Sequence, residues 1–205
     1  FGATVTSSKE VISIDGYNYS SVDKETLTIT TGENIINIYY TKRNNLSYTV
    51  NYLEKGTNKK LIDSKQVNNV VFETVIKTAD EKEKIYGYDY DSADKDQLII
   101  GTGENVINLY YIKKSTKVIV HYYEEGTTKK LSEDVTINGK VNDAYETISA
   151  KDILPKYELV AEPENKTGVM TEDTIEVIYY YRVKDAVVNA RYLEKGTEKQ
   201  LATPE

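Results

Sequence analysis

A polar decapeptide recurs three times in this chain at regular intervals. Its copies are YLEKGTNKKL at 52–61, YYEEGTTKKL at 122–131 and YLEKGTEKQL at 192–201. A second segment recurs in the same order, as GENIINIYY at 32–40, GENVINLYY at 103–111 and, less closely, EDTIEVIYYY at 172–181. Internal periodicity sets the number of folding units directly. The sequence therefore predicts a tandem array of units of about 70 residues, each with a small core.

These landmarks divide the chain into two complete and two partial repeats. The expected boundaries are 1–42 for the C-terminal part of a repeat, 45–114 and 116–183 for complete repeats, and 185–205 for the N-terminal hairpin of a further repeat. The connectors TKRNN, KKST and VKD are short, polar and free of Gly and Pro. They should restrict the angle between neighbouring repeats more than a Gly/Ser linker would.

Both ends of the sequence fall inside a repeat, so we expect the chain to be a fragment of a longer protein. Partial repeats leave sheet edges exposed, and such edges pair readily with other strands. We therefore expect self-association through the truncated end repeats, unless the true boundaries differ from those given above.

Strand patterns surround the decapeptide. The segments SYTVNYLEKG (47–56) and KVIVHYYEEG (117–126) alternate in polarity and are rich in β-branched and aromatic residues, which is typical of strands. One face of each strand should be apolar, formed by Tyr48, Val50 and Tyr52 in the first and by Val118, Val120 and Tyr122 in the second. The following turn has a glycine where a positive φ is expected, namely Gly56, Gly126 and Gly196. The decapeptide is thus interpreted as a strand end, a hairpin turn and the start of the next strand.

The remaining pattern predicts the fold class. Residues 73–84 (ETVIKTADEKEK) and 146–153 (ETISAKDI) are each expected to form a short helix, and 174–183 (TIEVIYYYRV) a closing strand. Each unit then reads strand–strand–helix–strand–strand, and its compact solution is a mixed sheet with the helix across one face. We therefore predict a β-rich α+β chain of tandem β-grasp (ubiquitin-like) repeats that form an elongated rod.

Composition excludes several classes of function. The net charge is −7 and the sequence pI is about 5.0, which disfavours nucleic acid and anionic membrane surfaces as partners. No apolar run approaches the length that spans a bilayer. The chain has no cysteine, which excludes disulfides and thiolate chemistry. No cofactor is expected.

Candidate residues for catalysis or metal binding are few. His121 is the only histidine and stands mid-strand, where the other copies have Asn51 and Arg191; a structural role is favoured over that of a general base. The run DYDSADKD at 89–96 is acidic, but it lacks the spacing of an EF-hand loop, and a solvated turn is favoured over a metal site. We therefore predict no enzyme and no metal site. A Lys–Asn isopeptide crosslink stays open, because the sequence offers too many candidate pairs.

Tyrosine is the one residue type that suggests a ligand. The chain has 19 Tyr, 2 Phe and no Trp. Tyrosine rings stack on the faces of sugars and the hydroxyl adds a hydrogen bond. Neighbouring strand residues point to opposite faces, so one member of each Tyr pair should be buried and the other exposed. We name Tyr111, Tyr123 and Tyr181 as candidate glycan contacts; sheet propensity and core packing alone also favour tyrosine at these positions.

The third repeat carries a family resemblance. Its motifs are VIVHYYEEG, KKLSEDV, GKVNDAYET (139–147), AKDI (150–153), ENKTGVMTED and the Tyr-rich closing strand. In this order they resemble a repeat of the mucin-binding protein (MucBP) family over 118–181. The second repeat matches at both ends, although its middle lacks the Gly–x–Val–x–Asp pattern.

The resemblance implies a β-grasp module repeated in adhesins attached to the cell wall of Gram-positive bacteria. It implies no enzymatic activity and no cofactor, and it fixes neither the ligand nor its contact residues. Host mucin glycans or glycoproteins are the implied partners.

Two functions follow from this reading. One is an adhesive module that contacts mucin, and the other is a structural stalk that projects a separate binding domain. An adhesive array should repeat its exposed aromatics, yet Tyr123 is replaced by Leu53 and Leu193 in the other copies. This favours the stalk as the physical role of the repeats and adhesion as the role of the parent protein.

Overall fold

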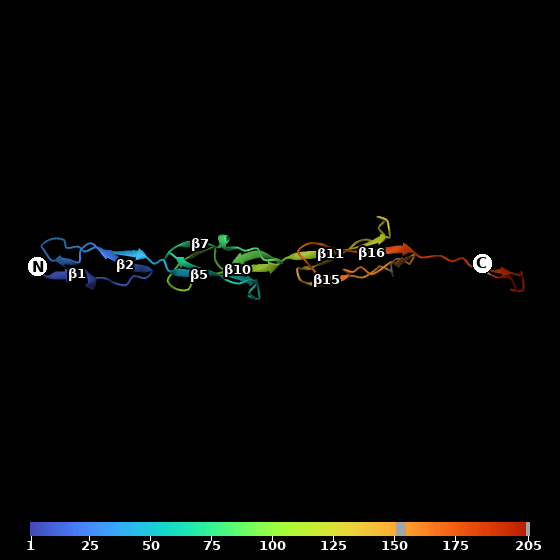
Figure 1. Cartoon of the computed structure of the whole chain (residues 1–205), viewed down its shortest axis with the longest axis horizontal. Helices are drawn as coiled ribbons and strands as arrows, with labels where there is room; N and C mark the ends of the chain where they lie inside the picture. Colours follow the sequence, from blue (N-terminus) through green and yellow to red (C-terminus); the bar gives the residue numbers. More distant parts are fainter. Residues whose placement is uncertain (151–154, 204–205) are drawn as a thin grey trace. The chain divides into compact units, whose positions relative to one another are not determined.

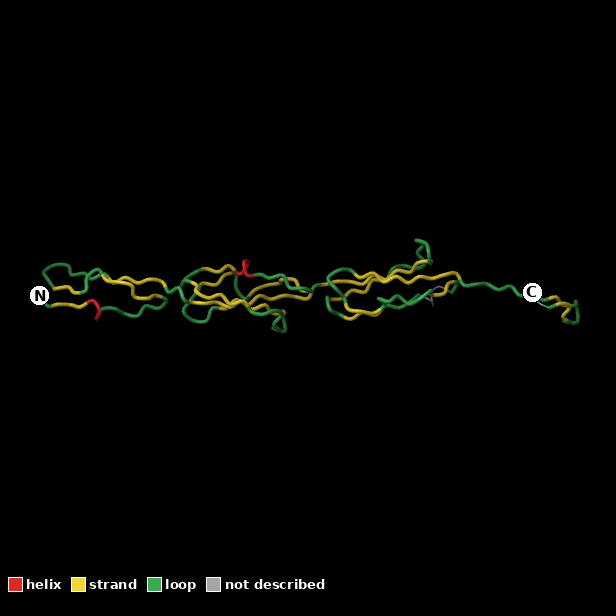
Figure 2. The backbone as a smooth tube through the Cα atoms, in the orientation of Figure 1, coloured by secondary structure: helices red, strands yellow, loops and turns green. Residues whose placement is uncertain are grey.

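The computed structural model describes residues 1–150 and 155–203. The chain forms two compact units, Phe1–Lys114 and Ser115–Glu205, which are considered separately. Strands and loops make up nearly all of the described chain (Figures 1 and 2). Helical turns among the described residues are confined to two short 3₁₀ segments, Ser7–Lys9 and Thr78–Glu81. None of the described helices has the length and apolarity needed to cross a bilayer.

The second repeat lies in the first unit. Its strands are β5 (Leu46–Glu54), β6 (Lys65–Val70), β7 (Val75–Lys77), β8 (Tyr88–Ala93), β9 (Gln97–Ile99) and β10 (Val106–Lys113). Four of them form a mixed sheet in the order β6-β5-β10-β8. The central strands β5 and β10 are parallel, and both outer strands are antiparallel to their neighbours. The short strands β7 and β9 form a separate antiparallel pair.

The third repeat, in the second unit, has the same topology. Its strands are β11 (Ser115–Glu124), β12 (Val135–Lys140), β13 (Ala144–Glu146), β14 (Tyr157–Leu159), β15 (Thr167–Val169) and β16 (Ile175–Val183). The sheet order is β12-β11-β16-β14, with β11 parallel to β16, and β13 pairs with β15. The sequence periodicity therefore corresponds to one structural unit repeated.

The end segments contain parts of the same unit. Residues 1–42 form β1 (Thr4–Thr6), η1 (Ser7–Lys9), β2 (Tyr17–Val22), β3 (Thr26–Thr28) and β4 (Ile38–Lys42). Strand β1 pairs with β3, and β2 pairs with β4. Near the other end, β17 (Tyr192–Leu193) and β18 (Gln200–Ala202) form a hairpin.

The inward faces of the central strands form the cores. Alternate residues of β5 and β11 are buried, as the sequence predicts, and include Tyr48, Val50 and Tyr52 in one repeat and Val118, Val120 and Tyr122 in the other. The parallel partner strands complete each core with Ile107, Leu109 and Tyr111, and with Val177, Tyr179 and Tyr181. Burial of these apolar and aromatic faces is the main favourable term in the folding of such small units.

The predicted helices are not confirmed. Of residues 73–84, Val75–Lys77 form β7 and only Thr78–Glu81 form a single 3₁₀ turn, η2. A hydrogen bond from the Tyr48 hydroxyl and an ion pair with Lys65 hold the buried Glu81 carboxylate. These tertiary contacts fix the segment in a short turn and override its helix propensity.

The second expected helix, 146–153, falls partly on residues outside the described ones. Strand β13 includes Glu146, and 147–150 contain no helix. The fold is therefore β-rich, and the described residues contain no α-helix. In the second repeat β7, η2 and a loop occupy residues 73–84, where a helix was expected.

The hairpin turns have the predicted backbone. The φ angles of Gly56, Gly126 and Gly196 are +86°, +71° and +94°. In the first of these turns the Glu54 amide donates to the Lys59 carbonyl at 2.8 Å. A left-handed residue is needed to reverse the chain here, which explains why each copy of the decapeptide has glycine at this position.

Candidate functional site

Two of the three tyrosines expected to contact glycans are buried. Tyr111 is 1% exposed and Tyr181 is 0% exposed. They lie on β10 and β16 in phase with the inward residues Leu109 and Tyr179, so their rings belong to the core. The prediction for these two residues is wrong. Tyr123 lies on the outer face of β11 and is half-buried.

The hydroxyl groups of these core tyrosines have a structural use. The Tyr111 hydroxyl donates to the Glu83 carbonyl at 3.0 Å and accepts from the Glu83 amide at 3.1 Å. Tyr40 makes the same pair of bonds with Ile12, at 2.8 and 3.1 Å. The Tyr181 hydroxyl accepts from the Ala150 amide. Burial raises the pKa of both Tyr111 and Tyr181. Tyr111 and Tyr181 therefore bind residues of the two segments where a helix was expected, and Tyr40 binds the backbone of Ile12 in residues 1–42.

The outward member of each tyrosine pair recurs between repeats. Tyr39 is 51% exposed, Tyr180 is 43% exposed, and Tyr110 is half-buried. In the parallel pairing of the central strands, Tyr110 lies opposite Leu53 and Tyr180 lies opposite Tyr123. Sequence reasoning identified the pairs but chose the buried member, Tyr111, in one of them. Its third candidate, Tyr181, is buried and lies outside the pair Tyr179–Tyr180. The phase of the alternation, counted from the apolar residues before each pair, could have identified the outward ones.

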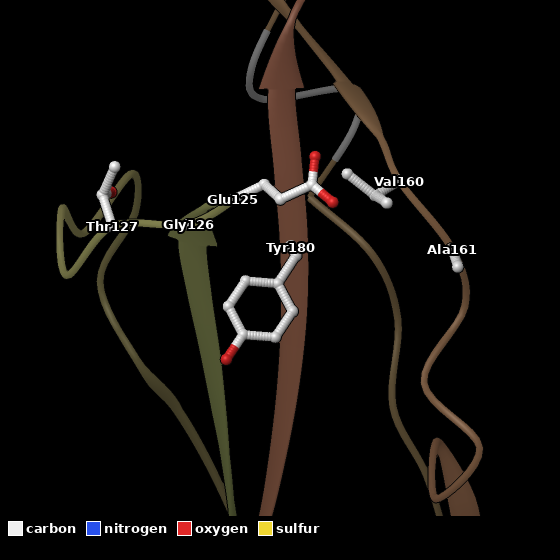
Figure 3. A pocket seen from close by; sticks show the side chains of 6 residues that line it. All are labelled: Glu125, Gly126, Thr127, Val160, Ala161 and Tyr180. Atoms are coloured by element: carbon white, nitrogen blue, oxygen red, sulfur yellow. The ribbon is translucent and has the colours of Figure 1, made fainter.

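A groove surrounds Tyr180 on the outer face of the third repeat. Its volume is about 460 Å³, and it is lined by Glu125, Gly126, Thr127, Val160, Ala161 and Tyr180. Figure 3 shows the Tyr180 ring between the turn that carries Thr127 and the segment that carries Val160 and Ala161. Both walls are attached to β16, because the Glu125 amide donates to the Tyr181 carbonyl at 2.8 Å and the Val160 amide to the Tyr180 carbonyl at 2.9 Å.

The chemistry of this groove suits binding. An exposed aromatic ring lies beside a carboxylate, a hydroxyl and two small apolar side chains, which together can stack on a sugar ring and accept hydrogen bonds from its hydroxyls. Glu125 is the single carboxylate among the lining residues. Glycoside hydrolysis by the usual mechanism needs a pair of carboxyl groups. The groove therefore has the groups for recognition and lacks the pair needed for that reaction.

The corresponding position in the second repeat is bridged. Lys55 follows β5 where Glu125 follows β11, and its ammonium group forms an ion pair with Asp91 of β8. A hydrogen bond between Lys55 and Asp91 lowers the pKa of the Asp91 carboxyl. In the third repeat the two sides carry Glu125 and Val160, which cannot pair in this way. The repeats thus present the outward tyrosine in different surroundings.

His121 and Tyr123 form a second feature of this outer face. Their rings stack with centroids 5.8 Å apart and an angle of 18° between the planes. His121 Nδ1 lies 2.9 Å from Asp134 Oδ1, and Lys130 Nζ lies 3.1 Å from Asp134 Oδ2. Burial raises the pKa of Asp134, but the interactions with His121 and Lys130 outweigh it and lower the pKa overall. These contacts are consistent with a structural role for His121.

The acidic run at 89–96 also has structural partners. The Asp94 carboxylate accepts from the backbone and side-chain amides of Asn108, at 3.0 and 3.1 Å. Asp23 accepts in the same way from Asn37, at 2.9 Å for both bonds. Within the described residues, no group of three or more His, Asp or Glu side chains is placed to hold a metal ion.

Comparison with known proteins places the third repeat in a family. Residues 117–182 match the model of the MucBP domain. This segment is therefore a MucBP domain, as its sequence resemblance predicts. Internalin J of Listeria monocytogenes serotype 4b (strain F2365) is 32% identical to the chain over 191 residues, which cover 88% of this chain and 20% of Internalin J. The chain thus spans about a fifth of the length of this curated relative.

Solved structures with some similarity include mucus-binding repeats. The type 2 repeat of the mucus binding protein MUB from Lactobacillus reuteri is 12% identical and covers 68% of this chain and 100% of its own, with a TM-score of 0.25. Mub-RV is 14% identical, with coverages of 68% and 100% and a TM-score of 0.27. The Bacillus anthracis TIE protein is 11% identical, with coverages of 91% and 48% and a TM-score of 0.44. Similarities of this size carry no argument about the ligand.

Proposed function

We propose that this chain is a non-enzymatic repeat region of a bacterial cell-surface adhesin, which acts as a stalk and contacts mucin or another host glycoprotein through its outward tyrosines. The proposal includes tandem β-grasp repeats with the boundaries 1–42, 45–114, 116–183 and 185–205. The mixed sheets with a central parallel pair support this arrangement. An extracellular location at the cell surface is part of the same proposal.

The observation that carries the adhesive role is the recurrence of an outward tyrosine. Tyr39, Tyr110 and Tyr180 occupy the same position in three repeats. Core packing does not require an aromatic ring on an outward face, so the packing that explains Tyr111 does not explain these three side chains. The groove at Tyr180 offers hydrogen-bonding groups beside the ring. Weak contacts repeated along one chain gain affinity through their effective concentration.

The alternative is a spacer that binds nothing and projects a separate ligand-binding domain. The Lys55–Asp91 pair favours it, because this pair links the turn after β5 to β8 in the repeat where Tyr110 is less exposed. Under this alternative the outward tyrosines stabilise the strands through their high strand propensity and bind no ligand.

Binding to purified mucin distinguishes the two functions. We expect saturable binding by the chain, which falls when the mucin glycans are removed. A variant with Tyr39→Ala, Tyr110→Ala and Tyr180→Ala should lose most of the binding. Tyr86→Ala is the matched control, since Tyr86 is 61% exposed and lies outside these positions. If the chain does not bind mucin even at high concentration, or if Tyr86→Ala loses as much binding as the triple variant, the spacer function is supported.

A further inference from the structure

Within the first unit, an aromatic side chain of the second repeat packs against the backbone of residues 1–42. A Cβ atom added to Gly16 would lie 2.3 Å from Phe72 Cε1 and 2.4 Å from Phe72 Cζ. The Tyr17 and Phe72 rings meet edge to face, with centroids 5.6 Å apart and an angle of 71° between their planes. The ring therefore occupies space that only glycine leaves free at this position.

Hydrogen bonds surround this aromatic contact. The Phe72 amide donates to the Arg43 carbonyl at 2.8 Å, and the Arg43 amide donates to the Gly16 carbonyl at 2.9 Å. In the loop between β9 and β10, the Thr102 hydroxyl donates to Asp15 Oδ2 at 2.8 Å. The connector is thus bound by its backbone to both neighbours.

The backbone next to Phe72 is also constrained. Glu73 has a φ of +62°, which is unfavourable for a residue with a side chain and persists where the surroundings hold it. Its amide donates to the Ile100 carbonyl at 2.8 Å, and its carboxylate forms a 2.8 Å ion pair with Lys42. This ion pair joins the second repeat to β4. The unusual backbone places the Phe72 ring toward Gly16 and the Glu73 carboxylate toward Lys42.

We propose that Phe72 and Gly16 form a lock between residues 1–42 and the second repeat, which fixes their relative orientation and couples their stabilities. The partner of this surface is the neighbouring repeat of the same chain. Repeats that contact only their nearest neighbours gain stability from each interface, so loss of the ring contact should weaken both sides. The use of the lock in a stalk rests on the function proposed above, but the coupling itself requires no ligand.

The test compares two glycines in the same segment. Gly16 and Gly32 have φ angles of +78° and +100°, and a Cβ at Gly32 would meet no atom within 4 Å. Gly16→Ala and Gly32→Ala therefore both impose a left-handed alanine, but only Gly16→Ala expels the Phe72 ring. We measure two quantities, the hydrogen exchange of the β2 and β4 amides and the residual dipolar couplings on both sides of the connector. Both are measured in the two glycine variants, in Phe72→Ala and in the double variant Gly16→Ala/Phe72→Ala.

We expect Gly16→Ala to speed exchange about ten-fold more than Gly32→Ala does, and to change the orientation of the two parts. In the Phe72→Ala background, Gly16→Ala should no longer speed exchange by this additional factor. A double-mutant cycle isolates the interaction between the two residues, and here that interaction is absent. Equal effects of the two glycine variants would overturn the lock. So would an excess that persists without the Phe72 ring. Neither readout involves mucin, so failure of this test and failure of mucin binding are separate results.

Discussion

The Tyr111 hydroxyl is the reason why the core of the second repeat contains tyrosine at a position that phenylalanine could fill. It makes two hydrogen bonds with the backbone of Glu83. Tyr111→Phe keeps the ring and removes both bonds, so we expect the unfolding free energy of this repeat to fall by about 1 kcal/mol. Urea unfolding followed by circular dichroism measures it.

Tyr110→Phe is the matched control for that measurement. Its side chain is on the opposite face of β10 and half-buried, so removal of its hydroxyl should change the unfolding free energy by less than about 0.5 kcal/mol. An equal loss in the two variants would contradict the structural role assigned to the Tyr111 hydroxyl.

Tyr52 presents the opposite case. Its hydroxyl is buried and has no hydrogen-bond partner among the described residues. Burial, aided by Glu83 and Glu81, raises its pKa from 10.0 to about 12. Because the folded pKa is the higher one, the folded state retains this proton above pH 10, and stability that is fully present below pH 10 is lost as the pH rises toward 12.

Tyr52→Phe should therefore leave the stability at pH 7 unchanged or raise it by up to about 1 kcal/mol, because a buried hydroxyl without a partner opposes folding. It should also reduce the loss of stability between pH 10 and 12. Unfolding of both chains at several pH values tests this. A large loss of stability at pH 7 would show that the hydroxyl has a partner in solution.

At the scale of the secondary structure elements, the hairpin turns show what the sequence can predict. Gly56 has a φ of +86° and open space around its Cα, whereas Gly103 has the same open space without a left-handed backbone. We expect Gly56→Ala to destabilise the second repeat by about 1 kcal/mol. Gly103→Ala should have little effect. Thermal unfolding of the two variants measures the difference, and equal melting temperatures would show that the turn does not need glycine.

The strands were predictable because their pattern is local. Alternation places Val50 and Tyr52 on the same face of a strand independently of the rest of the chain. The three copies of the turn show which position requires glycine. The expected helix at 73–84 failed for the opposite reason. Contacts from residues far away in sequence, such as the Tyr48 hydroxyl on Glu81 and the Tyr111 hydroxyl on Glu83, determine its conformation. Propensity within the segment contains no information about them.

The candidate site was predictable in kind and not in detail. The sequence indicated tyrosine pairs with one buried member, and the structure has this arrangement at Tyr110–Tyr111 and Tyr179–Tyr180. The choice within each pair depends on the phase of the strand, which a single-residue shift inverts. The groove beside Tyr180 also needs Val160 and Ala161, which lie on a separate segment and have no motif that marks them.

At the scale of the whole chain, the edge of β4 predicts self-association. Among the described strands, β4 pairs with β2 alone, whereas β10 and β16 each pair with two neighbours. Strand β17 corresponds in sequence to the ends of β5 and β11, the strands that pair with β10 and β16. The residues of β17 and β18 are exposed. We expect the hairpin of one copy to pair with β4 of another. Sedimentation velocity should then show a mass that rises with chain concentration, while a constant monomer mass would contradict the pairing.

The net charge of the chain makes a last prediction about mucin. At −7, the chain repels glycans that carry sialate or sulfate, and this repulsion weakens as salt shortens the Debye length from about 30 Å at 0.01 M to about 8 Å at 0.15 M. Affinity that rests on stacking at Tyr180 should therefore increase with salt on sialylated mucin. After sialidase treatment it should change little. Titrations at the two salt concentrations on both mucin forms decide this, and binding that weakens with added salt would point to contacts made by lysine or arginine side chains in place of the tyrosines.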